Sequence, residues 1–288
     1  MERRVKCWPQ HWGLIILTLV IFALLGRADQ ACPEPARLPP QYQNKLGMRL
    51  NLITGGSYLI GSPLEEPGRY LNEGPQHRVT LSPFYITATE ITNAQYSRFL
   101  AASGCPAPLY WLDKNLNAPD QPVVGVSWHD AVAFAKWLSR ETGETYRLPT
   151  EAEWEAAARG GLVGQPFPWG AAPPNARSHF RANYNPNTYA DDGYRYSAPV
   201  GRFPANGYGL FDLAGNVAEW CQDWYEAAYY KQSPRENPPG PPSGRFRVLR
   251  GGSWYSRARD LRCACRQFAA PHNADGFIGF RLVRIIQP

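Results

Sequence analysis

The side chains with the widest chemical repertoire in this chain are six cysteines and five histidines. The pair Cys263-Ala264-Cys265 is spaced too tightly for the usual CxxC metal clip. The histidines are far apart in sequence, and no two have the spacing of metal ligands. Ser253 follows two glycines, but a serine without an adjacent base is a weak indication of nucleophilic catalysis. Residue types alone therefore favour neither a metal centre nor a nucleophilic enzyme.

Three short helices are expected to position these residues, each opened by a hydroxyl side chain that can cap the first turn. The predicted caps are Thr92, Ser127 and Thr150, and Gly143 can end the second helix. Beyond Gly160, short aromatic segments alternate with Gly, Pro and Asn, which predicts irregular chain with brief strands. A domain with so many loops needs a fastener, either disulfides or bound metal.

The N-terminus is typical of a secretion signal. Three basic residues precede an apolar run over residues 13–25. That run would be about 20 Å long as a helix, which is short for a hydrocarbon layer of about 30 Å. Small residues at Gly26 and Ala28 then suit a signal peptidase. We expect a cleaved signal peptide over residues 1–28, a periplasmic or secreted protein, and no membrane contact after cleavage. The alternative is an uncleaved anchor.

Residues 29–46 are polar and proline-rich, which predicts an N-terminal arm or linker. No second linker, repeat or low-complexity block follows, so residues 47–288 are expected to form one domain. The formal net charge is +6, but the basic residues are scattered, and nothing indicates nucleic-acid binding. Cys7 would leave with the signal, and the five remaining cysteines then leave at least one unpaired or paired between chains.

A series of short motifs runs through this predicted domain. In order they are GGSYLIG at 55–61, EITN at 90–93, PVVGVSW at 122–128, RLPTEAEWE at 147–155, FPWG at 167–170, NGYGLFD at 206–212, GNVAEW at 215–220, RGGSW at 250–254 and GFR at 279–281. Together they resemble the formylglycine-generating enzyme, or sulfatase-modifying factor, superfamily over about residues 50–285. The resemblance implies an α+β class with little regular secondary structure: the formylglycine-generating-enzyme (C-type-lectin-like) fold as a single compact domain.

The resemblance also implies two structural calcium ions. The positions that match the family's ligand patterns are Asn183, Tyr184, Asp192 and Tyr194 for one ion, and Asp212, Gly215, Val217 and Glu219 for the other. Mixed carboxylate, amide and carbonyl oxygens are the ligands that a hard cation prefers. The alternative interpretation makes Asp212 and Glu219 ordinary turn and surface acids.

Oxidases of this family hold copper with two cysteines, and here the corresponding positions are Ser256 and, nearest to the second, Leu261. Neither side chain supplies the soft thiolate that copper(I) requires. The sequence therefore predicts no copper and no catalytic residue of the oxidase type.

One further cysteine of this chain, Cys263, matches a family position that forms a structural disulfide. The usual partner position is Ala158 here, so that bridge is lost, and Cys221 is the alternative partner. The other interpretation treats Cys263 and Cys265 as small buried apolar residues.

Three functions follow as hypotheses. The first is a non-catalytic accessory or regulatory scaffold that acts on a protein partner in the cell envelope, for example in type VI secretion or kinase signalling. The second is an oxidative maturation enzyme of a secreted metabolite such as pyoverdine, with a small-molecule substrate. The third, a true formylglycine-generating oxidase, is disfavoured by the missing cysteines.

Overall fold

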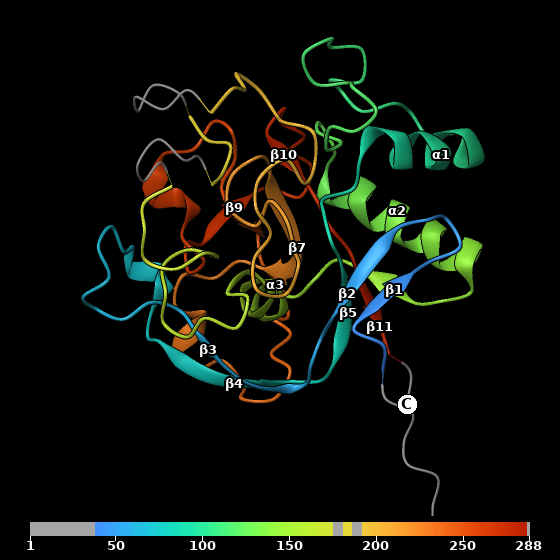
Figure 1. Cartoon of the computed structure of the whole chain (residues 1–288). Coiled ribbons are helices and arrows are strands. Elements are labelled where there is room, and N and C mark those ends of the chain that lie inside the picture. Colours follow the sequence, from blue (N-terminus) through green and yellow to red (C-terminus); the bar gives the residue numbers. More distant parts are fainter. Residues whose placement is uncertain (1–37, 175–180, 186–191, 287–288) are drawn as a thin grey trace, which may run out of the picture. The chain divides into compact units, whose positions relative to one another are not determined.

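The computed structural model describes residues 38–174, 181–185 and 192–286 (Figure 1). The chain divides into two compact units, and the described residues all belong to the second, Leu38–Pro288. The predicted signal peptide over residues 1–28 lies outside the described residues. Among the residues described, no helix is long and apolar enough to cross a membrane.

Regular structure is sparse, as the glycine and proline content predicts. The α-helices in the described part are α1 (Asn93–Ser103), α2 (Trp128–Thr142) and α3 (Glu151–Ala158). The short 3₁₀ helices are η1 (Leu71–Glu73), η4 (Tyr229–Lys231) and η5 (Ala258–Leu261). The strands are β1 (Gln41–Gln43), β2 (Arg49–Ile53), β3 (Gly56–Ile60), β4 (His77–Leu81), β5 (Phe84–Thr87), β6 (Tyr146–Arg147), β7 (Ala218–Trp224), β8 (Arg247–Arg250), β9 (Gln267–Ala269), β10 (Ile278–Gly279) and β11 (Val283–Ile285).

The strands form three sheets within the described residues. One has the order β1-β2-β5-β11-β6, the second β10-β7-β8-β9, and the third is the hairpin β3-β4. The helices α1 and α2 lie beside the first sheet in Figure 1, and α3 packs against β3, β7 and β8. The C-terminal strand β11 pairs with both β5 and β6, so the end of the domain is part of its central sheet.

The helices begin where the sequence predicts. In each, the hydroxyl of the capping residue accepts a hydrogen bond of 3.2 Å from the third backbone N–H of the helix. The capping residues are Thr92, Ser127 and Thr150. Gly143 ends α2 in the left-handed conformation, with φ of +77°, and donates its N–H to the carbonyl of Ser139 at 2.9 Å.

Aromatic side chains fill the core between α1, α2 and the C-terminal segment. The rings of Tyr96 and Phe134 stack with 5.5 Å between centroids, and Phe280 meets Phe134 edge-on at 5.5 Å. Trp154 of α3 is fully buried in a neighbouring apolar cluster. Burial of one such side chain contributes about 1.5–3 kcal/mol to folding, so these rings fix α1, α2 and α3 in place.

The predicted boundary between arm and domain is wrong at one point. Residues 41–43 fall within the range 29–46 that the sequence assigns to an arm or linker, yet they form β1, which pairs antiparallel with β2. The hydroxyl of Tyr85 also donates to the carbonyl of Pro39 at 2.7 Å. The composition of the stretch hides a short edge strand, because polar residues suit the solvent-facing edge of a sheet.

Candidate functional site

A large cleft, of about 1190 Å³, lies where η1, η5, β9 and β10 approach the loop after β8. Its lining combines aromatic rings with amide and charged side chains. The aromatic residues are Tyr70, Phe246, Tyr255, Phe268 and Phe277, and the polar ones include Asn72, Asn185, Ser253, Ser256, Arg257, Asp260, Asn273 and Asp275. Both Ser253 and Ser256, the serines of the sequence analysis, therefore face the same cavity.

The loop after β8 turns sharply to present these serines. Gly251 and Gly252 have φ of +89° and +69°, a region that favours glycine. A Cβ on Gly252 would lie only 2.9 Å from a methyl carbon of Leu261. The hydroxyl of Ser256 accepts the N–H of Ser253 at 3.0 Å, and the N–H of Ser256 donates to the Ser253 carbonyl at 2.9 Å. Ser256 thus closes a tight turn.

Leu261, near the second family copper position, is fully buried. It belongs to a small apolar cluster with Phe167, Ala182, Tyr184 and Ala214. The two positions that the oxidases fill with thiolates therefore hold a hydrogen-bonded hydroxyl and a packed hydrocarbon. Neither group is a ligand for a soft copper ion.

Burial disfavours the thiolate form of the nearby cysteines. Burial raises the pKa of the Cys263 thiol and of the Cys265 thiol to about 12, and burial raises the pKa of Cys221 well above its usual value. The predicted bond between Cys221 and Cys263 is not formed in the structure. Cys221, Cys263 and Cys265 are all free and buried, which is the alternative that the sequence left open.

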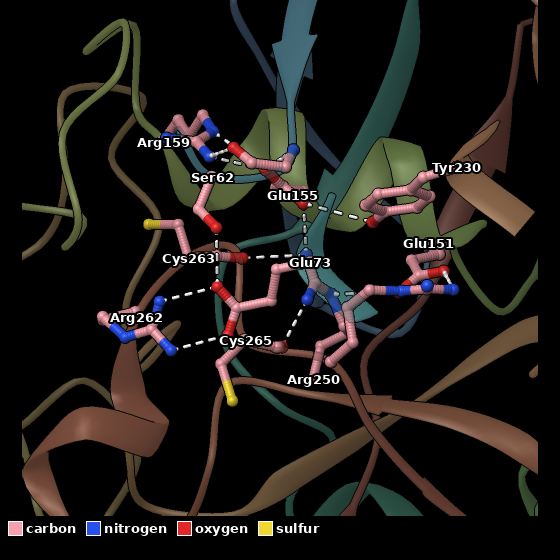
Figure 2. A network of polar contacts seen from close by, with 12 residues as sticks. Ser62, Glu73, Glu151, Glu155, Arg159, Tyr230, Arg250, Arg262, Cys263 and Cys265 are labelled. Carbon is pink, nitrogen blue, oxygen red and sulfur yellow. Dashed lines mark hydrogen bonds and ion pairs between the residues drawn. The ribbon is translucent and has the colours of Figure 1, made fainter. Parts of the chain in front are cut away.

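A network of buried ion pairs holds the segment that carries these cysteines (Figure 2). Arg250, at the end of β8, donates to Glu155 of α3 at 2.5 Å and to the carbonyl of Cys263 at 2.8 Å. It also donates to the carbonyl of Cys265. Arg159 binds the other oxygen of Glu155 at 2.6 Å.

Two more arginines extend this network toward the cleft. Arg262 binds Glu73 at 2.6 Å and 2.7 Å and Glu66 at 2.8 Å. Arg266 binds both oxygens of Glu151, at 2.7 Å and 2.8 Å. Arg266 also lines the cleft, so buried ion pairs support the cleft wall. Loss of one partner of such a pair would destabilise the fold.

The first predicted calcium site lies at the edge of the described residues. Asn183 is fully buried, and its side-chain oxygen has no hydrogen-bond partner among the residues described. The carboxylate of Asp192 accepts the backbone N–H of Tyr184 at 2.9 Å and that of Tyr194 at 3.0 Å. These contacts bring the four predicted ligand residues together. A buried amide oxygen with no donor among the described residues suits a hard cation, and the Asp192 carboxylate bonds to the next residue along the chain, Tyr184.

The second predicted site contains more buried acidic side chains than the sequence suggests. Glu219 binds Arg281 through both oxygens, at 2.6 Å and 2.7 Å, and accepts the indole N–H of Trp154 at 2.7 Å. Asp212 is buried and accepts the N–H of Gly201 at 2.6 Å. Both acids are buried. The alternative interpretation, which made them ordinary turn and surface acids, is therefore wrong in placing them on the surface.

Glu90 is a third buried acid at this place, and sequence reasoning gave it no role. Burial, and then the charge of Asp212, raise the pKa of Glu90 well above its usual value. Burial likewise raises the pKa of Asp212 to about 6. The three acids therefore surround one guanidinium, that of Arg281, which bonds to Glu219 and feels the charges of Glu90 and Asp212. Among the described residues, the three acids do not lie close enough together to hold a metal ion on their own. An ion here would also need the backbone carbonyls of Gly215 and Val217.

Asn216 connects the two predicted calcium sites to the cleft. Its side-chain amide donates to Glu90 at 2.9 Å, and its side-chain oxygen accepts from Asn183 at 3.3 Å. Its backbone carbonyl accepts the N–H of Trp254 at 2.8 Å, and Gly215 donates to the carbonyl of Gly251 at 2.9 Å. The predicted ligand loop thus supports the turn that presents Ser253. Asn216 has φ of +58°. The signal for its role available in the sequence was its position directly after Gly215 in the motif GNVAEW.

Comparison with known proteins identifies the family. Residues 35–286 match the sulfatase-modifying factor enzyme 1-like domain. The chain is 34% identical to the formylglycine-generating enzyme of Streptomyces coelicolor over 88% of this chain and 93% of that protein. The structure of PvdO from Pseudomonas aeruginosa is similar, with a TM-score of 0.78 and 31% identity over 87% of this chain and 100% of PvdO. The chain belongs to the formylglycine-generating enzyme, or sulfatase-modifying factor, family.

The same domain occurs inside larger proteins. The chain is 37% identical to the serine/threonine-protein kinase pkn1 of Chlamydia caviae, over 81% of this chain but only 37% of the kinase. The family and fold class expected from the motifs are therefore confirmed: an α+β domain of the formylglycine-generating-enzyme type with sparse regular structure.

Proposed function

We propose that this protein is an exported, non-catalytic member of the formylglycine-generating enzyme family that binds a polypeptide segment of a cell-envelope partner in the cleft beside Ser253. One observation carries the proposal: the protein has a large cleft, but the two family copper positions hold residues that cannot bind copper. Ser256 closes a turn in the cleft wall and Leu261 is packed in the core, whereas the cleft beside Ser256 stays open.

The lining of the cleft suits an extended chain better than a compact apolar ligand. Tyr255 and Phe268 are large rings with 63% and 46% of their surface exposed. Aromatic side chains of this kind dominate the binding energy of protein interfaces. Asn72, Asn185 and Asn273 place amide groups among the rings, and amides can both donate to and accept from a peptide backbone.

Two structural calcium ions belong to this proposal. Their role would be to hold the loop of residues 212–219, which bonds to the turn at Gly251 and so shapes the cleft. The support is the oxygen of Asn183, which has no hydrogen-bond partner among the described residues, and the three acidic side chains around Arg281. Calcium bound there would favour the ionised form of these acids. Because calcium would bind the folded domain and not the unfolded chain, it would stabilise the fold.

Site-specific photo-crosslinking in cells tests the proposed partner binding. A photoreactive amino acid replaces Tyr255 in the cleft, and a matched variant carries it at Leu109, an exposed residue outside the cleft lining. We expect a crosslink to a cell-envelope protein from position 255 that is weakened by Phe268→Ala and is missing at position 109. Equal crosslinking at both positions, or none at 255, would overturn the proposal.

A second function is supported by the likeness to PvdO. The alternative is an enzyme of oxidative metabolite maturation, such as that of pyoverdine, with Ser253 and Ser256 in contact with a small-molecule substrate. Mass spectrometry of secreted metabolites separates the two functions. A strain carrying Ser253→Ala and Ser256→Ala would accumulate an unoxidised precursor if the enzyme hypothesis holds, and would secrete the normal products if the protein is a scaffold.

A further inference from the structure

A smaller cavity, of about 320 Å³, lies between α2 and the ends of β7 and β8. It is lined by one face of α2, by β6 and Leu148, by the ends of β7 and β8, and by two prolines. Trp128, Val132, Ala135 and Lys136 contribute from α2, where their spacing places them on one face. This cavity shares no lining residue with the cleft beside Ser253.

Arg247 is the unusual residue of this cavity. Its guanidinium lies 3.5 Å from the ring centre of Trp224 and 3.7 Å from that of Trp128, so the two indoles sandwich it. Trp224 is its cross-strand neighbour in the β7-β8 ladder, and the indole N–H of Trp128 is fixed by the carbonyl of Cys221 at 2.9 Å. The plane of the guanidinium is therefore set before any ligand arrives.

The guanidinium of Arg247 forms no ion pair with a carboxylate in the described part of the chain, unlike the guanidinium groups of the buried arginines. The fully buried arginines of the described residues each form an ion pair with a glutamate; they are Arg159, Arg250, Arg262, Arg266 and Arg281. Arg247 is half-buried, donates one hydrogen bond of 2.6 Å to the carbonyl of Gln222, and has no ion pair within the described part of the chain. Its Nε is buried without a partner there.

The charges around Arg247 leave the cavity positive. No aspartate or glutamate lines it, whereas Lys136 and Arg147 do. Arg147 is neutralised by Glu153 at 2.6 Å and 2.7 Å. Asp223 is the acid whose charge acts on Arg247, but burial raises the pKa of Asp223 to about 8, so it is largely protonated at neutral pH. Burial also lowers the pKa of Arg247 to about 10, which leaves it charged.

We propose that this cavity is a binding site for a carboxylate on a small apolar body, with Arg247 as the anion-binding residue and Lys136 as a second charge at the rim. A guanidinium held flat between two rings presents its donors in the geometry that a carboxylate accepts. Trp128, Val132 and Leu148 supply apolar surface for the rest of the ligand. A volume near 300 Å³ is at the small end for ligand pockets, which favours a ligand the size of one amino-acid residue.

Such a carboxylate has two sources, a free monocarboxylic acid or the C-terminus of a peptide that ends in an apolar residue. N-acetyl-L-leucine represents the peptide end and hexanoate the free acid, and N-acetyl-L-leucinamide is the uncharged control. Titration of the ¹⁵N-labelled protein, followed through the indole N–H signals of Trp128 and Trp224, should give a Kd on the order of a millimolar for at least one acid. Tighter binding of N-acetyl-L-leucine than of hexanoate would indicate the peptide source, and the reverse order the free acid.

Three variants test the residues. Arg247→Gln should weaken binding of the acid at least about tenfold, or about 1.4 kcal/mol, and Lys136→Gln about two- to threefold, because an exposed charge contributes less. Arg140→Gln, also exposed on α2 but outside the cavity lining, should leave the Kd unchanged.

Two results would overturn the proposal. One is equal binding of N-acetyl-L-leucine and its amide, which would remove any role for the carboxylate. The other is an unchanged Kd in a folded Arg247→Gln protein. If Arg247→Gln does not fold, the comparison of acid with amide in the wild-type protein and the loss in Lys136→Gln relative to Arg140→Gln decide the matter. Failure of the cleft proposal would not affect either result, since the two sites share no lining residue.

Discussion

Removal of the charge on Glu155 tests how strongly the buried ion-pair network supports the cleft. Glu155 is fully buried and is the shared partner of Arg250 and Arg159, at 2.5 Å and 2.6 Å. The variant Glu155→Gln keeps the size of the side chain. It leaves the buried Arg159 without its anion, and Arg250 keeps only the longer ion pair with Glu151 at 3.8 Å. Breaking a buried pair in this way costs about 3–5 kcal/mol. For a domain of this size that corresponds to a fall in Tm of roughly 6–20 °C.

The measurement is reversible unfolding in denaturant, with Tm as a second readout. Glu141→Gln, at an exposed position of α2, is the matched control and should change the free energy of unfolding by no more than about 0.5 kcal/mol. The network also holds the backbone of Cys263 and Cys265, so Glu155→Gln should speed thiol labelling at these buried cysteines, while the exposed Cys105 reacts at its usual rate. A free energy of unfolding within about 1 kcal/mol of the wild-type value would refute the reasoning.

Other predictions concern calcium, pH and export. A chelator should lower Tm, and Glu219→Ala should remove part of the effect; a melting curve indifferent to both chelator and calcium would contradict the proposed ions. Burial, and then the charge of Glu151, raise the pKa of Asp223 from 3.8 to about 8, so the folded protein keeps a proton that the unfolded chain releases. Stability should therefore fall as pH rises from about 4 to about 8 and then level off, and Asp223→Asn should flatten that fall; an identical pH profile in the variant would refute the assignment. Mass spectrometry of the exported protein should find the mature N-terminus after Ala28, and an intact Met1 in the membrane fraction would indicate an anchor.

The sequence predicts the local structure of this protein well where a single residue determines it, as at the start of a helix. Caps at Thr92 and Ser127 place their helices because a single side-chain hydrogen bond fixes the first turn. The family follows from motifs that recur in a fixed order. The edge strand β1 was missed because an exposed strand of three residues carries no hydrophobic alternation.

The site was predictable only in part, since its energetics depend on contacts between distant segments. Glu90 and Arg281 each lie in a recognised motif, but nothing in either motif shows that the two side chains meet Asp212 in one buried cluster. The sandwich of Arg247 joins α2 to the β7-β8 pair and has no local signature at all. The disulfide expected between Cys221 and Cys263 also depended on a pairing that spacing cannot fix.

Anaerobic titration with copper(I) in the presence of a competing chelator tests the central claim most directly, because the proposed scaffold has no copper site. Ser256 and Leu261 offer no thiolate, and Cys263 and Cys265 are buried with raised pKa values. The wild-type protein should therefore fail to compete with the chelator, and Cys263→Ser/Cys265→Ser should behave identically. Tight one-to-one binding in the wild-type protein that is lost in the double variant would contradict the account and favour an oxidative enzyme.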